Sequence, residues 1–311
     1  MSTDDGLWVT EETYPGFRIS HKVLEGRSVF VKRTRWQEIK LVDTVNFGKM
    51  LIIDGLIQSS EKDERYYHEA IVHPAMITHP KPRDVLILGG GEGASLREVL
   101  RHNTVKSVVM VEIDEEVVSL SKEHLLSMHD HSYNDQRVTL VIDDAIEYVR
   151  RCVNEGRRFD VIIQDLTDPY KDSPSVMLYT REYFKAVHEI LNDDGIFVTQ
   201  ATLLHPSSRA FVIIHNTLML TFKIVRGYVT YIPSYANLIG FIIGSKEYDP
   251  LSVSKEEIEN RLNTRGIAKE SLYAYDPDTH ISYFILPKYI RKDIKSLNEI
   301  STRDRPVTFP L

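Results

Sequence analysis

The sequence predicts an α/β protein in which an antiparallel β-domain precedes a doubly wound, mostly parallel sheet. Residues 1 to about 60 alternate apolar and polar side chains and are broken by Gly and Asn turns, as half-buried strands are. From residue 84 onward, short and nearly continuous apolar runs alternate with helical patterns. Such runs are typical of strands buried on both faces, and their alternation with helices predicts a parallel sheet.

The first domain is expected to span residues 1–80. Its strands are predicted within KVLEGRSVFVKRT, WQEIKLVDT and KMLIIDGLIQSS. The next segment, EKDERYYHEAIVHPAMITHP, predicts a linking helix. We expect this helix to stop near Pro74 and Pro80, because proline lacks the backbone donor that a helix interior needs.

The second domain is expected to span residues 81–250 and to carry the parallel sheet. Its strands are predicted at DVLIL, SVVMVEI, VTLVI, FDVIIQDL and GIFVTQA. The helices between them are predicted at SLREVLRH, EEVVSLSKEHLL, AIEYVRRCV and REYFKAVHEIL. The runs FKIVRGYVTYIP and LIGFIIGSK predict a closing antiparallel pair. Residues 251–311 are expected to add a charged surface helix, VSKEEIENRLNTRG, and a loose tail, STRDRPVTFPL, which has no period.

Composition and charge exclude several classes of function. The net charge of −7 and the lack of a basic run argue against a nucleic-acid partner, whose phosphates need clustered Lys and Arg. No apolar run is long enough for a membrane helix, and the acidic start MSTDDGLWVTEE does not resemble a signal peptide. Cys152 is the single cysteine, which indicates a reduced thiol. We therefore expect a soluble cytoplasmic protein.

The stretch VLILGGGEGAS predicts a strand, a tight turn and a helix that border a ligand pocket. Gly89, Gly91 and Ala94 fit G-x-G-x-x-A, in which glycines allow close backbone approach and the alanine lets the helix pack on the sheet. Glu112 follows about twenty residues later at the end of the next strand, where an acid can accept both hydroxyls of a ribose. This Rossmann-like arrangement predicts that the pocket binds a nucleoside. The alternative for Glu112 is an acid at a strand end that is exposed to solvent.

Glu92, inside this turn, decides which kind of nucleoside fits. Two unit charges about 4 Å apart cost roughly 4 kcal/mol near a protein surface, so Glu92 disfavours a pyrophosphate and hence a nicotinamide dinucleotide. A positively charged sulfonium nucleoside, such as S-adenosylmethionine, is compatible with Glu92. A sulfonium nucleoside that lacks the amino-acid carboxylate fits better, because no second negative charge then faces Glu92. The alternative is a Glu92 side chain that points to solvent.

Acids also stand at the ends of the following strands. In VIDDAIEYV, a carboxylate at Asp143 or Asp144 could accept from an adenine amino group, or Asp144 could cap the helix. In VIIQDLTDP, Asp165 and Asp168 are expected to face one cavity, where paired carboxylates can provide a general base, although D-x-x-D also caps helices. Acids at four successive strand ends of one sheet favour a ligand-binding site over separate helix caps.

The sequence predicts no catalytic metal and no nucleophilic serine. In HEAIVH, His68 and His73 are one residue too far apart to share a helical face as in H-E-x-x-H. The stretch LHPSSRAF lacks the nucleophile-elbow spacing, so Ser207 and Ser208 are interpreted as loop or helix-start residues.

Several of these motifs, in order and spacing, resemble the polyamine aminopropyltransferase (spermidine synthase) family. They are KDERYYHEAIVHPAM, GGGEGASLREVLRH, VVMVEID, IDDAIEYV and DLTDP. The resemblance implies an N-terminal β-domain, a methyltransferase-like Rossmann domain and assembly as a homodimer or homotetramer. It also implies transfer of an aminopropyl group from decarboxylated S-adenosylmethionine, a co-substrate, to an amine, with release of methylthioadenosine and with no metal or other cofactor.

Site residues carry over from the resemblance by position. It implies that Asp165 is the general base, that Asp168 holds the acceptor amine and that Glu92 meets the aminopropyl amine. It also implies a set of substrate-binding residues: Gln37, Tyr67, His68, Glu112, Asp144, Ala145, Gln200 and Tyr235. Of these, Tyr67 is also implied to be catalytic. Pro174 matches a gate after DLTDP.

Two departures bear on the acceptor. The stretch IPSYANLIGF stands where putrescine-using members carry YPSG, and GGGEGA replaces GGGDGG. Both resemble the thermospermine branch and its prokaryotic relatives, some of which use agmatine. The acceptor is left open among putrescine, cadaverine, agmatine, norspermidine and spermidine. The alternatives are an S-adenosylmethionine-dependent methyltransferase and a catalytically inactive binding or assembly subunit.

Overall fold

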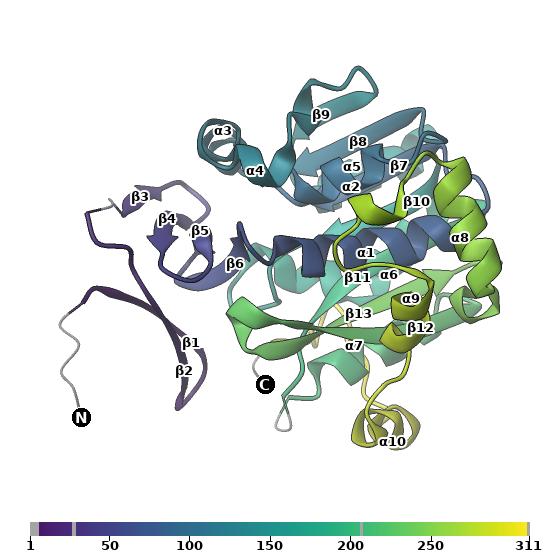
Figure 1. Ribbon diagram of the computed structural model, residues 1–311. Coiled ribbons are helices and arrows are strands. Elements are labelled where there is room, and N and C mark those ends of the chain that lie inside the picture. Colours follow the sequence, from purple (N-terminus) through teal and green to yellow (C-terminus); the bar gives the residue numbers. More distant parts are fainter. Residues whose placement is uncertain (1–5, 27–28, 206–207, 310–311) are drawn as a thin grey trace.

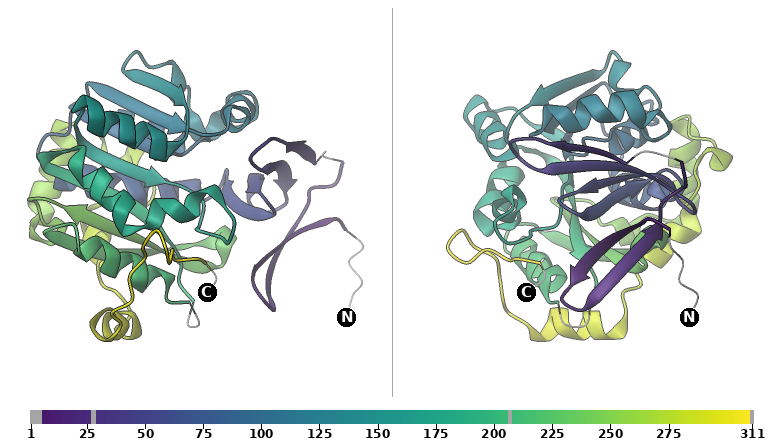
Figure 2. Two further views of the ribbon diagram at one scale, coloured as in Figure 1. Left: turned by 180° about the vertical axis from the view of Figure 1, so that it is seen from behind. Right: turned by 90° about the vertical axis from the view of Figure 1, so that its left-hand side faces the viewer.

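The computed structural model describes residues 6–26, 29–205 and 208–309, and it confirms a β-domain followed by a doubly wound sheet (Figure 1). The β-domain holds two antiparallel sheets. One is the hairpin of β1 (Trp8–Tyr14) and β2 (Phe17–Lys22). The other has the order β3-β4-β5-β6 and consists of β3 (Phe30–Arg33), β4 (Glu38–Thr44), β5 (Gly48–Ile53) and β6 (Leu56–Ser60). Both lie on the same side of the molecule (Figure 2).

Helix α1 (Glu64–Thr78) joins the two domains and continues through Pro74, so the prediction that it stops there is wrong. Proline cannot donate to the carbonyl four residues earlier, which is that of Ala70. The Tyr228 hydroxyl donates to this carbonyl instead, at 2.8 Å. A tertiary contact therefore replaces the missing helical hydrogen bond, and the helix ends just before Pro80, as predicted.

The main sheet has seven strands in the order β12-β13-β11-β10-β7-β8-β9. The parallel strands are β7 (Asp84–Gly89), β8 (Ser107–Glu112), β9 (Val138–Ile142), β10 (Phe159–Asp165) and β11 (Leu191–Leu203). Strands β12 (Ile224–Ile232) and β13 (Asn237–Ser245) form the predicted antiparallel pair. Strand β9 departs from the expected double burial, because it lies at the sheet edge and its side chains are partly exposed.

Helices cover both faces of this sheet, as a doubly wound fold requires. Helices α1, α2 (Ala94–Leu100) and α8 (Lys255–Thr264) lie on one face, and α5 (Ala145–Glu155), α6 (Arg181–Glu189) and α7 (Ala210–Met219) lie on the other (Figures 1 and 2). The short helices α3 (Glu115–His124) and α4 (Leu126–His129) follow β8.

Ser207 lies outside the described residues, while Ser208 accepts from the Ala210 N–H at 3.3 Å, as a helix-start residue does. Among the described residues, no helix could cross a membrane.

The C-terminal segment includes the predicted charged helix α8 and adds α9 (Pro277–Tyr283) and α10 (Lys288–Ser296). The prediction of a loose tail is wrong for the residues through 309, because Val307 and Phe309 are buried in the main core. Two apolar side chains in a short irregular segment give no periodic signal, so the sequence alone did not reveal this packing.

Candidate active site

The acids at the strand ends meet in one cavity, as the sequence predicted. The neighbouring strands β10, β7, β8 and β9 bring Asp165, Glu92, Glu112 and Asp144 to the same edge of the sheet, because the carboxyl ends of parallel strands meet there. All the site residues inferred from the sequence line this cavity: Gln37, Tyr67, His68, Gly89, Gly91, Glu92, Glu112, Asp144, Ala145, Asp165, Asp168, Gln200 and Tyr235.

The glycine-rich turn packs directly against the neighbouring strand ends. Gly89 has φ +82°, and a Cβ there would lie 2.2 Å from the Asp165 carbonyl oxygen. A Cβ on Gly91 would lie 2.9 Å from the Glu112 carboxylate. The next amide, that of Gly90, donates to the Asp165 carbonyl at 2.8 Å. Side chains at these positions would separate the turn from the acids that line the cavity.

The Asp165 carboxylate is buried and held at both oxygens. Oδ1 accepts from the Tyr67 hydroxyl at 2.8 Å, and Oδ2 accepts from the Ser95 hydroxyl at 2.6 Å. Burial and the negative charge of Glu92 raise the pKa of Asp165, while His68 and the two hydroxyls oppose this rise. A carboxyl with a raised pKa and a fixed orientation is suited to take a proton. Sequence reasoning missed Ser95, which lies in a helical pattern without a catalytic signature.

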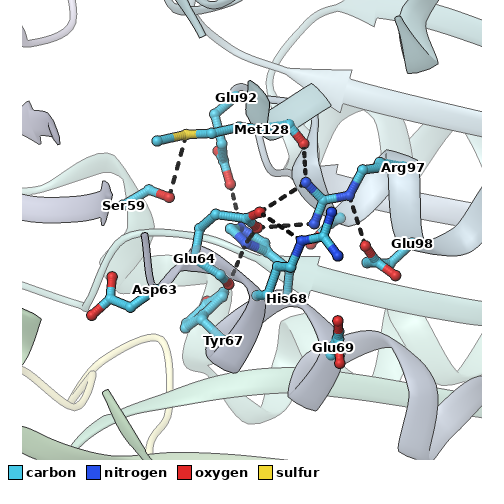
Figure 3. A network of polar contacts seen from close by, with 12 residues as sticks. Ser59, Asp63, Glu64, Tyr67, His68, Glu69, Glu92, Arg97, Glu98 and Met128 are labelled. Carbon is cyan, nitrogen blue, oxygen red and sulfur yellow. Dashed lines mark hydrogen bonds and ion pairs between the residues drawn. The ribbon is translucent and has the colours of Figure 1, made fainter. Parts of the chain in front are cut away.

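Glu92 points into the molecule and not toward solvent. Its side chain is 12% exposed, and its Oε1 lies 2.6 Å from His68 Nε2. The other ring nitrogen of His68, Nδ1, lies 2.8 Å from Glu64 Oε2 (Figure 3). Although burial lowers the pKa of His68, the two carboxylates outweigh this effect and raise it well above the usual value. The two carboxylates thus favour the imidazolium form of the ring, which links Glu64 to Glu92.

A buried guanidinium continues this network. Arg97 binds both carboxylate oxygens of Glu64, at 2.8 and 3.0 Å, and its Nε donates to Glu98 at 2.7 Å (Figure 3). Bidentate pairs of this kind fix orientation as well as charge. Arg97 thereby holds Glu64, which in turn holds His68 beside Glu92. The sequence did not reveal this series of ion pairs, because charged residues on a short helix are usually solvent-exposed.

His68 and His73 do not share a site. His73 faces Glu98 and His102, at 3.1 Å each, while the ring of His68 lies beside Glu92 and Asp165. Potential ligand atoms of His68, Glu92 and Asp165 lie within 4.8 Å of one another. However, both nitrogens of His68 face carboxylate oxygens, and a ring nitrogen that donates a hydrogen bond has no lone pair for a metal. The lack of a catalytic metal stays a prediction.

The cavity has a second acidic end, beyond β10. Here the Asp168 carboxylate accepts from Gln200 Nε2 at 3.0 Å. Desolvation raises the pKa of Asp168 to about 7, and the Gln200 hydrogen bond offsets part of this rise. Tyr235 lines this end and donates to the Gln58 carbonyl. Pro174, which matches the gate after DLTDP, lines the same cavity.

Glu11 is a further acid of this cavity that sequence reasoning missed. It lies on β1, is 6% exposed, and accepts from the Ile57 N–H at 2.8 Å. Burial raises its pKa, against the lowering effect of hydrogen bonds from Thr13 and Ile57. Its inward position in a strand of alternating burial is the one feature of the sequence that could have indicated this placement. Glu11 belongs to none of the motifs described above.

The end of the cavity beneath β8 and β9 is bounded by polar groups that the backbone fixes. Glu112 accepts from the Asp114 N–H at 3.0 Å, and burial raises the pKa of Glu112 to about 7. Asp144 caps α5 through hydrogen bonds from the Ile146 and Glu147 amides, at 2.7 and 3.4 Å, so the capping role foreseen for it holds. Gln37 Nε2 donates to Asp114 at 3.0 Å.

Comparison with known proteins identifies relatives along nearly the whole chain. Residues 64–255 match the spermine/spermidine synthase domain, and residues 7–61 match the spermidine synthase tetramerisation domain. A polyamine aminopropyltransferase of Sulfurisphaera tokodaii is 43% identical over 97% of both chains. One from Pyrobaculum calidifontis is 48% identical over 76% of this chain and 82% of its own.

Solved structures agree with these matches. A spermidine synthase in complex with the transition-state analogue AdoDATO superposes with a TM-score of 0.83 and 28% identity, covering 94% of this chain and 96% of the other. The spermidine synthase of Thermotoga maritima superposes with a TM-score of 0.80 and 27% identity, covering 94% and 95%.

Proposed function

Because the chain belongs to the spermine/spermidine synthase family of polyamine aminopropyltransferases, we propose that it transfers the aminopropyl group of decarboxylated S-adenosylmethionine to an amine, with Asp165 as the base. The observation that carries this proposal is the inward-facing Glu92, which lies in the same cavity as Asp165 and the second acidic end. A dication and a cationic nucleoside both suit a cavity lined by carboxylates.

The donor is proposed to lie along the strand ends from β9 to β7. Glu112 would accept the ribose hydroxyls, and Asp144 with the Ala145 amide would meet the adenine. Glu92 would then bind the ammonium of the aminopropyl group. An intact S-adenosylmethionine would bring a carboxylate toward Glu92, which disfavours it. The geometry thus supports the decarboxylated donor over the methyltransferase alternative.

The proposed reaction is a single displacement. Asp165 takes a proton from the acceptor ammonium, and the free amine attacks the carbon next to the sulfonium. A nitrogen–carbon bond forms as the carbon–sulfur bond breaks, and the sulfur keeps the electron pair as methylthioadenosine leaves. The positive sulfur already provides the leaving group, so the enzyme contributes mainly positioning and proton removal. Hydrogen bonds from Tyr67 and Ser95 support this role, because they orient the Asp165 carboxylate.

The acceptor is proposed to extend from Asp165 into the second acidic end. Asp168, oriented by Gln200, would hold one far ammonium, and Glu11 provides a further carboxylate near Asp168. A second acid at this end, together with IPSYAN before the closing strand, supports a triamine or agmatine over putrescine. Assembly as a homodimer or homotetramer is proposed through the β-domain, where Trp8, Phe30 and Val31 are exposed.

Donor selection tests the proposed function. We would measure binding of decarboxylated S-adenosylmethionine and of S-adenosylmethionine by calorimetry. The decarboxylated form should bind at least about tenfold more tightly, since even a screened contact between like charges costs over 1 kcal/mol. Glu92→Gln should reduce this preference, and Glu116→Gln, a change in an ion pair outside the cavity, should retain it. A preference for S-adenosylmethionine would favour a methyltransferase instead.

A further inference from the structure

The C-terminal tail joins two segments that border the acidic acceptor end of the cavity. One is the loop 166–175, which carries Asp168 and Tyr170, and the other is β1, which carries Glu11 and Tyr14. The last described residues, in yellow, run along the catalytic domain toward the β1–β2 hairpin (Figure 2). The tail is thus distant in sequence from both segments but lies against them in space.

Phe309 makes the contacts at this junction. It is fully buried, and its N–H donates to the Pro169 carbonyl at 2.9 Å, one residue after Asp168. Its ring packs edge-on against Tyr170, at 5.8 Å between centroids, and against Tyr14, at 5.3 Å. One side chain therefore contacts both the loop and the strand.

The tail that carries Phe309 is itself anchored. Ser301 accepts from the Arg181 N–H at 2.9 Å through its carbonyl, and its own N–H donates to Thr217 at 2.8 Å. The Val307 N–H donates to the Ser301 hydroxyl at 2.9 Å. These contacts tie the tail to the start of α6 and to α7. Phe309 is consequently presented from a fixed support.

We propose that Phe309 is a positioning residue for the acceptor site, because it fixes the loop 166–175 against β1 and so holds Asp168 in place. Gln200 holds the loop from the cavity side, where it donates to the Leu166 carbonyl and to Asp168, at 3.0 Å each. Phe309 holds the same loop from the outside. The role in acceptor binding rests on the proposed function, whereas the anchoring of the loop does not. The ligand concerned is a polycationic amine.

Hydrogen exchange tests the anchoring without any substrate. In Phe309→Ala, the amides of residues 166–175 should exchange at least about tenfold faster than in the wild type, while those of β7 and β8 keep their rates. Phe284→Ala is the matched control, because it removes a similar ring from the C-terminal segment, where Phe284 packs against Tyr228 at 4.9 Å. Unchanged exchange of the loop in Phe309→Ala, or an equal increase in the control, would overturn the proposal.

Kinetics test the consequence for the acceptor. With spermidine and with putrescine as probes, Phe309→Ala should raise the acceptor KM about tenfold and change the donor KM less than about twofold, because only the acceptor wall loosens. Phe309→Leu, which keeps apolar volume, should restore most of the acceptor KM. Equal changes in both KM values would contradict the positioning role. A wild type without turnover would refute the proposed function, and the exchange experiment would still decide the anchoring.

Discussion

Replacing Asp165 with asparagine removes a proton acceptor with minimal change of shape. The wild-type carboxylate is buried and accepts from Tyr67 and Ser95, and an asparagine can retain one of these two hydrogen bonds through its carbonyl oxygen. The amide nitrogen then faces the other hydroxyl, which can rotate to accept. The fold and the donor site should therefore survive, while the ability to deprotonate an ammonium is lost.

The expected loss in kcat follows from what a general base contributes. Such a group typically contributes about 10²- to 10⁴-fold, so Asp165→Asn should lower kcat at least about a hundredfold. That loss corresponds to roughly 2.7 kcal/mol of transition-state stabilisation. Affinity for methylthioadenosine should change less than about threefold, because the substitution leaves Glu112 and Asp144, the proposed nucleoside contacts, intact.

The assay measures release of methylthioadenosine by chromatography under saturating donor and amine. Asp160→Asn is the control, since Asp160 lies on the same strand but at its opposite end, where it accepts from the Arg83 and Asp84 amides. This control should keep kcat close to that of the wild type. A near-normal kcat in Asp165→Asn would refute the assignment of Asp165 as the base.

Other predictions concern pH, orientation and stability. Because burial raises the pKa of Asp168 to about 7 and its carboxylate form attracts an ammonium, kcat/KM for the amine should rise as the pH increases through 7, and Asp168→Asn should flatten this rise. The Ser95 hydrogen bond lowers the pKa of Asp165, so Ser95→Ala should move the acidic limb of the kcat profile to higher pH, whereas Ser95→Thr should not. Arg97→Met removes one cationic partner from each of two buried carboxylates, Glu64 and Glu98, and should cost about 3–5 kcal/mol of unfolding free energy, measured in urea. A loss below about 1 kcal/mol would show that the buried network is not needed for stability.

The sequence revealed those parts of the site that follow from strand order. In a parallel sheet, residues at the carboxyl ends of neighbouring strands lie at the same edge, so Glu92, Glu112, Asp144 and Asp165 could be placed together without coordinates. The glycine pattern further predicted which edge borders the cavity. The roles proposed for these acids come from the resemblance to a family, because the pattern of acids alone does not assign them.

The parts that could not be predicted depend on contacts between distant segments. Pro74 remains within a helix because a tyrosine hydroxyl replaces the lost donor. In the sequence, Ser95 and Arg97 are ordinary residues of a short helix, and only the fold brings them to buried acids, Asp165 on β10 and Glu64 on α1. Glu11 lines the cavity, and Phe309 packs behind its wall against Tyr170. These two residues come from opposite ends of the chain, and neither stands in a recognisable motif.

The central claim is aminopropyl transfer to an amine, and an acceptor screen tests it most directly. The purified protein would be incubated with decarboxylated S-adenosylmethionine and, separately, with putrescine, cadaverine, agmatine, norspermidine and spermidine, and the products would be resolved by chromatography. We predict methylthioadenosine and an aminopropylated product in equal amounts, with a triamine or agmatine as the preferred acceptor. No product with any of these amines, from protein that still binds the donor, would contradict the account.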